Sequence, residues 1–87
     1  MRQLNRVHLN GLRAVEATGR LGGLKPAAEE LGVTVGAVSQ QIQKVENQLG
    51  RPLFSRGAQG LRPTPLGDEV LVHLTAGFSE LARGVEI

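Results

Sequence analysis

Apolar side chains recur along the chain at intervals of three and four residues, in blocks separated by glycine or proline. This spacing predicts amphipathic helices, because residues three and four apart share one face of an α-helix. The first block contains Leu9, Leu12 and Val15, with Asn10 as a suitable N-cap, and it fades at Gly19 and Gly22-Gly23. The second opens at Lys25-Pro26 and closes at Gly32, just before a third block. Two helices joined by so short a turn indicate a helix-turn-helix.

The third block predicts a helix that begins after Thr34, a good N-cap. Its apolar positions form one stripe: Val35, Val38, Ile42, Val45 and Leu49. The opposite face is polar, almost uncharged and small at its start: Gly36, Ala37, Gln40, Gln43, Lys44 and Asn47, with Ser39 at its flank. Amides and small side chains suit a helix in the major groove of DNA, where they contact base edges. The alternative is an undistinguished solvent-facing surface.

The segment after Gly50 predicts a short β-hairpin, or wing. Leu53-Phe54 supply an apolar anchor, and Gly57-Ala58-Gln59-Gly60 form the expected tip. Pro63 limits strand pairing at the far end, because proline has no backbone N–H to donate.

A fourth helix is expected to start at Thr64-Pro65, an N-cap followed by proline in the first helical turn. Its apolar stripe is longer than a small three-helix core can cover, so a partner helix is expected. The candidate dimer contacts are Leu66, Val70, Leu74, Phe78 and Leu81. The alternative is that the first turns of this helix fold back on the core of the same chain.

The composition is that of a single globular domain, with 40% hydrophobic and 21% charged residues in a chain of 87. The chain has no cysteine, which excludes disulfides and thiolate metal sites, and we expect neither metal nor cofactor. No apolar run approaches the roughly 20 residues that cross a bilayer, and no signal peptide is recognisable. We therefore expect a cytoplasmic protein that has no contact with membranes.

Charge is unevenly distributed along the chain. Basic residues outnumber acidic ones up to Ala28, and residues 51–67 carry three arginines (Arg51, Arg56 and Arg62) without an acid. From Asp68 onward acidic residues predominate. One part of the molecule is thus suited to a polyanion such as DNA, and the C-terminal segment is not.

Two other classes of function agree less well with the sequence. An enzyme is disfavoured, because His8 and His73 are isolated, Ser39 lies in no nucleophile motif, and the glycines of the hairpin are not followed by the lysine of a phosphate loop. We expect no catalytic residue. A winged helix that binds only proteins is the second alternative, but the third helix lacks the large exposed apolar groups such a surface needs.

Several motifs together resemble the LysR-type transcriptional regulators over roughly residues 9–81. They are Ala27-Ala28-Glu29-Glu30-Leu31-Gly32-Val33-Thr34, Ala37-Val38-Ser39-Gln40-Gln41-Ile42, Pro52-Leu53-Phe54-Ser55-Arg56 and Thr64-Pro65-Leu66-Gly67. Within that family, the segment from Leu9 to Ala17 is similar to the branch of glycine-cleavage activators and β-lactamase regulators. The resemblance implies a C-terminal effector-binding domain, which this chain does not contain.

The resemblance also implies site residues. It places groove contacts at Val35, Gly36, Ser39 and Gln40, a phosphate contact of the wing at Arg56, and antiparallel pairing of the linker helices. Five positions depart from the usual family residue. Position 35 is commonly Gln and here is Val, position 36 is commonly Pro or another small residue and here is Gly, and position 40 is often Arg and here is Gln. Gly23 stands where Ser is usual, and Pro63 where an aliphatic residue is usual. The target sequence of another member therefore does not transfer to this chain.

These observations predict a mainly α fold: a winged helix-turn-helix (three-helix core and small β wing) at residues 1–63, followed by a long linker and dimerisation helix at 64–87. The predicted function is sequence-specific binding of double-stranded DNA as a homodimer that regulates transcription. The predicted DNA contacts are Thr34, Val35, Gly36, Ser39, Gln40, Gln43, Lys44, Arg56 and Arg62.

Overall fold

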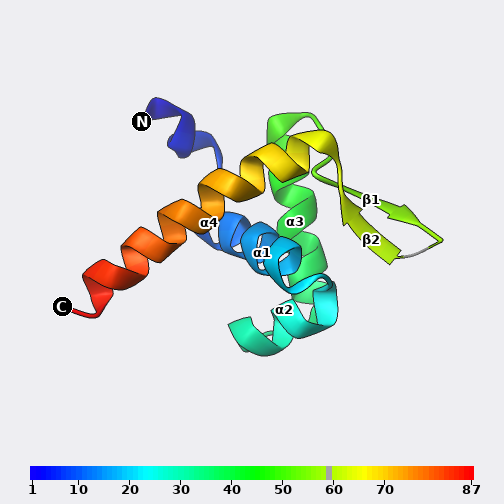
Figure 1. Ribbon diagram of the computed structural model, residues 1–87. Coiled ribbons are helices and arrows are strands. Elements are labelled where there is room, and N and C mark those ends of the chain that lie inside the picture. The colour runs from blue at the N-terminus through cyan, green and yellow to red at the C-terminus, as the bar shows by residue number, and fades with distance from the viewer. Residues whose placement is uncertain (59) are drawn as a thin grey trace.

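Three helices pack against one another (Figure 1). The core between them is built largely from small side chains. The computed structural model describes residues 1–58 and 60–87. A 3-10 helix, η1 (Arg2–Arg6), precedes α1 (Leu9–Leu21), α2 (Leu24–Leu31) and α3 (Val35–Leu49), and α1 contacts both of the other helices. The strands β1 (Phe54–Gly57) and β2 (Gly60–Pro63) and the long helix α4 (Pro65–Val85) follow. The predicted fold class, a winged helix-turn-helix with a long C-terminal helix, is confirmed.

The turn between α2 and α3 has the predicted form. Gly32 ends α2 in the left-handed region (φ 69°), which glycine adopts without the steric cost that a Cβ brings. The Thr34 hydroxyl then caps α3 by accepting the backbone N–H of Ala37 at 3.1 Å. Both positions were identified from sequence because capping depends on neighbouring residues alone.

The starts of α1 and α2 were predicted wrongly. The N-cap of α1 is His8, whose backbone is extended and whose carbonyl accepts the N–H of Leu12, so Asn10 lies inside the helix. Helix α2 begins at Leu24 with Gly23 as N-cap, one residue before Lys25-Pro26. Neither N-cap residue contributes a side-chain hydrogen bond. The residue preferences for capping side chains therefore could not locate these two helix starts.

The predicted stripe of α3 is buried in its middle and exposed at its ends. Val38, Ile42 and Val45 are core residues. Val35 and Leu49 are 43% and 37% exposed, because they lie at the two ends of the helix, beyond the elements that pack against its middle. The full buried hydrophobic set is Ala14, Val15, Ala17, Ala27, Ala28, Val38, Ile42, Val45, Leu53 and Phe54.

The wing is a two-stranded antiparallel hairpin that projects from the helical core (Figure 1). Its register pairs Phe54 with Pro63 and Arg56 with Leu61. Leu53 and Phe54 are buried, as the prediction of an apolar anchor requires. Gln59, part of the predicted tip, lies outside the described residues.

Helix α4 crosses α1, and its C-terminal half extends to the side of the molecule opposite the wing (Figure 1). Leu66, Val70 and Leu74 pack against the core of the same chain, so the first turns do fold back, the alternative raised from sequence. Phe78 is half-buried, and Leu81 is 55% exposed. Among the described helices, none combines the length and the apolar character that crossing a membrane would require.

Candidate nucleic-acid interface

The side of α3 that points away from the core carries five exposed residues: Gly36, Gln40, Gln43, Lys44 and Asn47. We call this surface the polar face of α3. Ala37, predicted to belong to it, is instead half-buried in a shallow pocket against α1. The polar face therefore presents three amide side chains and one charge, the combination that hydrogen-bonds base edges without strong non-specific attraction.

A cleft of about 230 Å³ separates α3 from the wing. Its walls are formed by Leu24, Ser39, Ile42, Gln43, Glu46, Phe54, Arg56 and Leu61. Arg56, from β1, thus shares this cleft with Ser39 and Gln43 from α3. Three of the predicted DNA contacts, separated by up to seventeen positions in the chain, are brought together here.

The strand register places the two wing arginines on opposite faces. Successive side chains of a strand point to alternate sides, and directly paired residues share a side. Arg56 pairs with Leu61 and lies on the side of the cleft, whereas Arg62 pairs with Ser55 on the other side. Both arginines are exposed. The structure therefore separates two residues that the charge pattern had grouped.

Glu46 fixes the base of the wing to α3, a role that the sequence analysis did not assign. One oxygen of its carboxylate, Oε2, accepts the backbone N–H groups of Leu53 and Phe54 at 2.7 and 3.1 Å. On the other side, Thr64 donates its hydroxyl to the carbonyl of Pro52 at 2.9 Å and caps α4 through the N–H of Gly67. The wing is thus held between α3 and α4.

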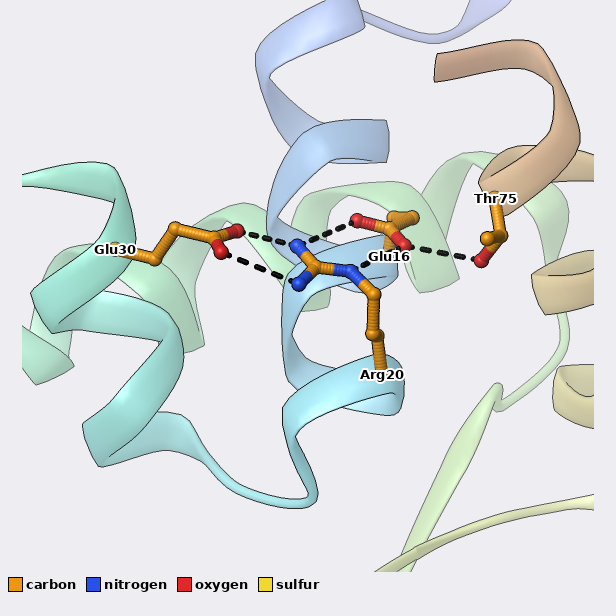
Figure 2. Close-up of polar contacts among 4 residues, drawn as sticks. All are labelled: Glu16, Arg20, Glu30 and Thr75. Carbon is orange, nitrogen blue, oxygen red and sulfur yellow. Dashed lines mark hydrogen bonds and ion pairs between the residues drawn. The ribbon is translucent and has the colours of Figure 1, made fainter. Parts of the chain in front are cut away.

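A polar network joins three helices (Figure 2). Arg20, in α1, donates to Glu16 one turn earlier, with Nε 2.8 Å from Oε2, and also to Glu30 of α2. Glu16 is buried, and it accepts a further hydrogen bond from the hydroxyl of Thr75 in α4. Hydrogen bonds to a charged group are stronger than neutral ones, so the network fixes the positions of α2 and α4 relative to α1.

The network shifts the pKa values of Arg20 and Glu30, which lie at its exposed end. The hydrogen bonds donated by Arg20 hold the pKa of the Glu30 carboxyl below its usual value. The same contacts, with Glu30 first and Glu16 second, raise the pKa of Arg20 further above its already high value. Both groups are therefore charged at neutral pH. No group of acidic or histidine side chains in residues 1–58 and 60–87 is arranged to hold a metal ion.

The family model for bacterial regulatory helix-turn-helix proteins of the lysR family matches residues 9–68, which include α1 to α3, the wing and the start of α4. The chain belongs to the LysR family. The resemblance found in the sequence motifs is thereby confirmed.

Individual LysR-family regulators match most of this chain. It is 40% identical over its whole length to the transcriptional regulator PerR of Escherichia coli, covering 29% of that protein. Over 88% of its length it is 49% identical to the regulator TrpI of Pseudomonas aeruginosa, covering 26% of it. The activator AmpR of Citrobacter freundii is 42% identical over 87% of this chain, which covers 26% of AmpR. The chain thus spans less than a third of the length of these relatives.

Solved structures of LysR-family DNA-binding domains have the same fold as this chain. The DNA-binding domain of BenM in complex with the catB site 1 DNA matches 92% of this chain and 90% of its own, with a TM-score of 0.83 and 28% identity. The BenM domain bound to the benA site 1 DNA matches the same shares with a TM-score of 0.82 and 28% identity. Both of those domains were solved on DNA.

Proposed function

We propose that this LysR-family chain binds double-stranded DNA in a sequence-specific manner, with α3 in the major groove and the wing on the phosphate backbone, to regulate transcription. The observation that carries the proposal is the polar face of α3, an exposed and nearly uncharged surface beside a cleft that contains Arg56. The similarity to BenM domains bound to DNA supports it.

Within this proposal the predicted contacts have three roles. Gln40 and Gln43 are exposed amides that pair with base edges, and the small Gly36 allows the helix to approach closely. Arg56 and Arg62 neutralise phosphates, which fixes the position of the protein on DNA without reading sequence. Since the two arginines lie on opposite faces of the wing, they contact different phosphates. The hydroxyl of Thr34 caps α3, so the contribution of Thr34 is to fix the first turn.

Fluorescence anisotropy with a duplex selected from random sequences tests the placement of α3. Gln40→Ala is expected to weaken binding by about 1–3 kcal/mol and to relax the preference at one base pair. Gln48→Ala is the matched control, because Gln48 is also exposed on α3 but lies off the polar face. Unchanged affinity and base preference of the Gln40 variant would contradict the proposal.

The wing is tested by the salt dependence of binding. Arg56→Ala is expected to weaken binding to every duplex and to lower the slope of log K against log salt by about one, because one phosphate contact is lost. Arg83→Ala serves as control, since Arg83 is near the end of α4 and pairs with Glu80. A loss confined to one sequence, with the slope unchanged, would show that Arg56 reads a base.

We further propose that the active form is a homodimer that pairs through the C-terminal part of α4. A groove of about 500 Å³ runs between this part of α4 and helices α1 and α2, and Phe78, Leu81 and Val85 line one side of it. Leu81 and Val85 are exposed in the single chain. Leu66, Val70 and Leu74 also serve the core, so the dimer contact depends chiefly on Phe78 and Leu81.

A twofold axis through α4 relates two copies of α3, so the recognised sequence is nearly palindromic with half-sites about one turn, ~34 Å, or a multiple of it apart. Light scattering at high protein concentration is expected to give the dimer mass. Leu81→Glu is expected to give monomers without unfolding, unlike a charge at Leu74, which packs against the core. Val72→Glu, on the opposite face of α4, is the control that stays dimeric. A monomer mass for the unmodified chain would overturn this part of the proposal.

A further inference from the structure

Val35 is an apolar side chain that the core of this protein does not cover. It is the first residue of α3, and it is 43% exposed, whereas Val38 and Val45 on the same stripe are each 1% exposed. The apolar spacing placed Val35 in the core stripe, and the family resemblance placed it among the groove contacts. The structure excludes a core position for Val35, because burial is confined to the middle of the helix.

The immediate surroundings of Val35 leave room for a ligand. A Cβ added to Gly36 would meet only the Thr34 hydroxyl oxygen, at 4.0 Å, so the surface beside Val35 is open. Ser39 lies one helical turn further on, at the flank that faces the wing cleft. None of these side chains is charged, and β-branching holds the two methyl groups of Val35 in one preferred rotamer within a helix.

The chemistry of Val35 selects its ligand. Valine offers neither a donor nor an acceptor, so it contributes to recognition only by apolar contact. Among the four bases, thymine alone presents a methyl group, on C5, in the major groove. We propose that Val35 selects thymine at one position of the recognised sequence by contact with this 5-methyl group. This inference rests on the proposed placement of α3 in the major groove.

Replacing each thymine of the selected duplex by deoxyuridine, one at a time, tests the inference directly, because only the methyl group is removed. At one position the substitution is expected to weaken binding about fourfold, the effect of losing one buried methyl group. Val35→Ala is expected to bind the thymine and deoxyuridine duplexes equally. At the same position, 5-methylcytosine is expected to bind the unmodified protein more tightly than cytosine does, and this difference also disappears in Val35→Ala.

Val33→Ala is the matched control. Val33 is also an exposed valine, 48% exposed, but it lies in the turn before α3, in a pocket with Arg13 and Gln41. Its replacement is expected to leave the preference for thymine over deoxyuridine unchanged. Because both valines are exposed, thermal melting is expected to show both variants folded. Val35→Thr, which keeps one methyl group, gives a second variant with an intermediate preference.

The outcomes separate this inference from the proposed function. If no thymine responds to loss of its methyl group while Gln40→Ala still changes base preference, α3 lies in the groove and the role of Val35 is wrong. A methyl preference that survives in Val35→Ala likewise overturns it, since another residue then contacts the methyl. If Gln40→Ala has no effect either, the placement of α3 fails, and the inference fails with it.

Discussion

The hydroxyl group of Thr75 donates a hydrogen bond of 2.9 Å to the carboxylate of Glu16, 59 positions earlier in the chain (Figure 2). This polar contact attaches α4 to α1. Because Glu16 also accepts hydrogen bonds from Arg20, which contacts Glu30, this contact connects the position of α4 to α2. In the proposed dimer, the geometry of the two copies of α3 depends on this attachment.

We predict that Thr75→Val lowers the free energy of unfolding by about 1 kcal/mol, because valine keeps the shape of threonine but cannot donate the hydrogen bond. Thr75→Ser, which keeps the hydroxyl, is the control. In a double-mutant cycle with Glu16→Ala, which removes the acceptor, measured by urea denaturation, the two effects are expected to be coupled rather than additive. Strict additivity would show that the Thr75–Glu16 contact does not contribute to stability.

The Arg20–Glu30 pair predicts a pH dependence. Since the folded pKa of Glu30 is lowered, its contribution to stability is present above the usual pKa of glutamate and is lost as pH falls through the folded value. Both side chains are about 40% exposed, so the contribution is less than about 1 kcal/mol.

NMR titration of the Glu30 carboxyl carbon measures this directly. In Arg20→Gln the pKa of Glu30 is expected to rise toward its usual value, because the main hydrogen-bond donor is gone. An unchanged titration of Glu30 in the variant would contradict the assignment of the shift to Arg20.

Gly67 is predicted to tolerate no side chain. A Cβ at this position would lie 2.0 Å from the backbone carbonyl oxygen of Leu53, so α4 or the base of the wing must move. Gly67→Ala is expected to lower the free energy of unfolding by about 1–3 kcal/mol. Gly77→Ala, in the same helix with no atom within 4 Å, is the control, and it is expected to stabilise the protein by up to about 1 kcal/mol. Equal effects of the two substitutions in urea denaturation would refute the close packing at Gly67.

The Glu46 carboxylate is predicted to protect two backbone amides from hydrogen exchange. In Glu46→Ala the amides of Leu53 and Phe54 lose their acceptor, and their exchange is expected to become roughly tenfold faster or more. The amide of Ala37, which donates to Thr34, reports on general loosening of the fold and is expected not to change. Equal acceleration of all three amides would indicate global destabilisation instead of release of the wing.

Local signals in the sequence were sufficient for the order and most boundaries of the elements. Thr34 and Thr64 cap α3 and α4 as predicted, and Gly32 ends α2. Such signals work because a cap involves residues only a few positions apart. The starts of α1 and α2 were missed, because their N-cap residues, His8 and Gly23, provide no side-chain cap.

The sequence by itself determined the helical periodicity, the hairpin and the LysR-family motifs, since each of these features depends on residues close together in the chain. Only the tertiary structure decided that Val35 is exposed, that Leu74 packs against the core, and that Arg56 and Arg62 lie on opposite faces of the wing. The physical reason is that a periodic stripe shows which side of a helix is apolar, but not how far along that side the neighbouring elements reach. Likewise, the alternation of side chains along a strand shows which residues share a face. Which of the two faces of the hairpin lies toward α3 depends on how the hairpin packs against the helices.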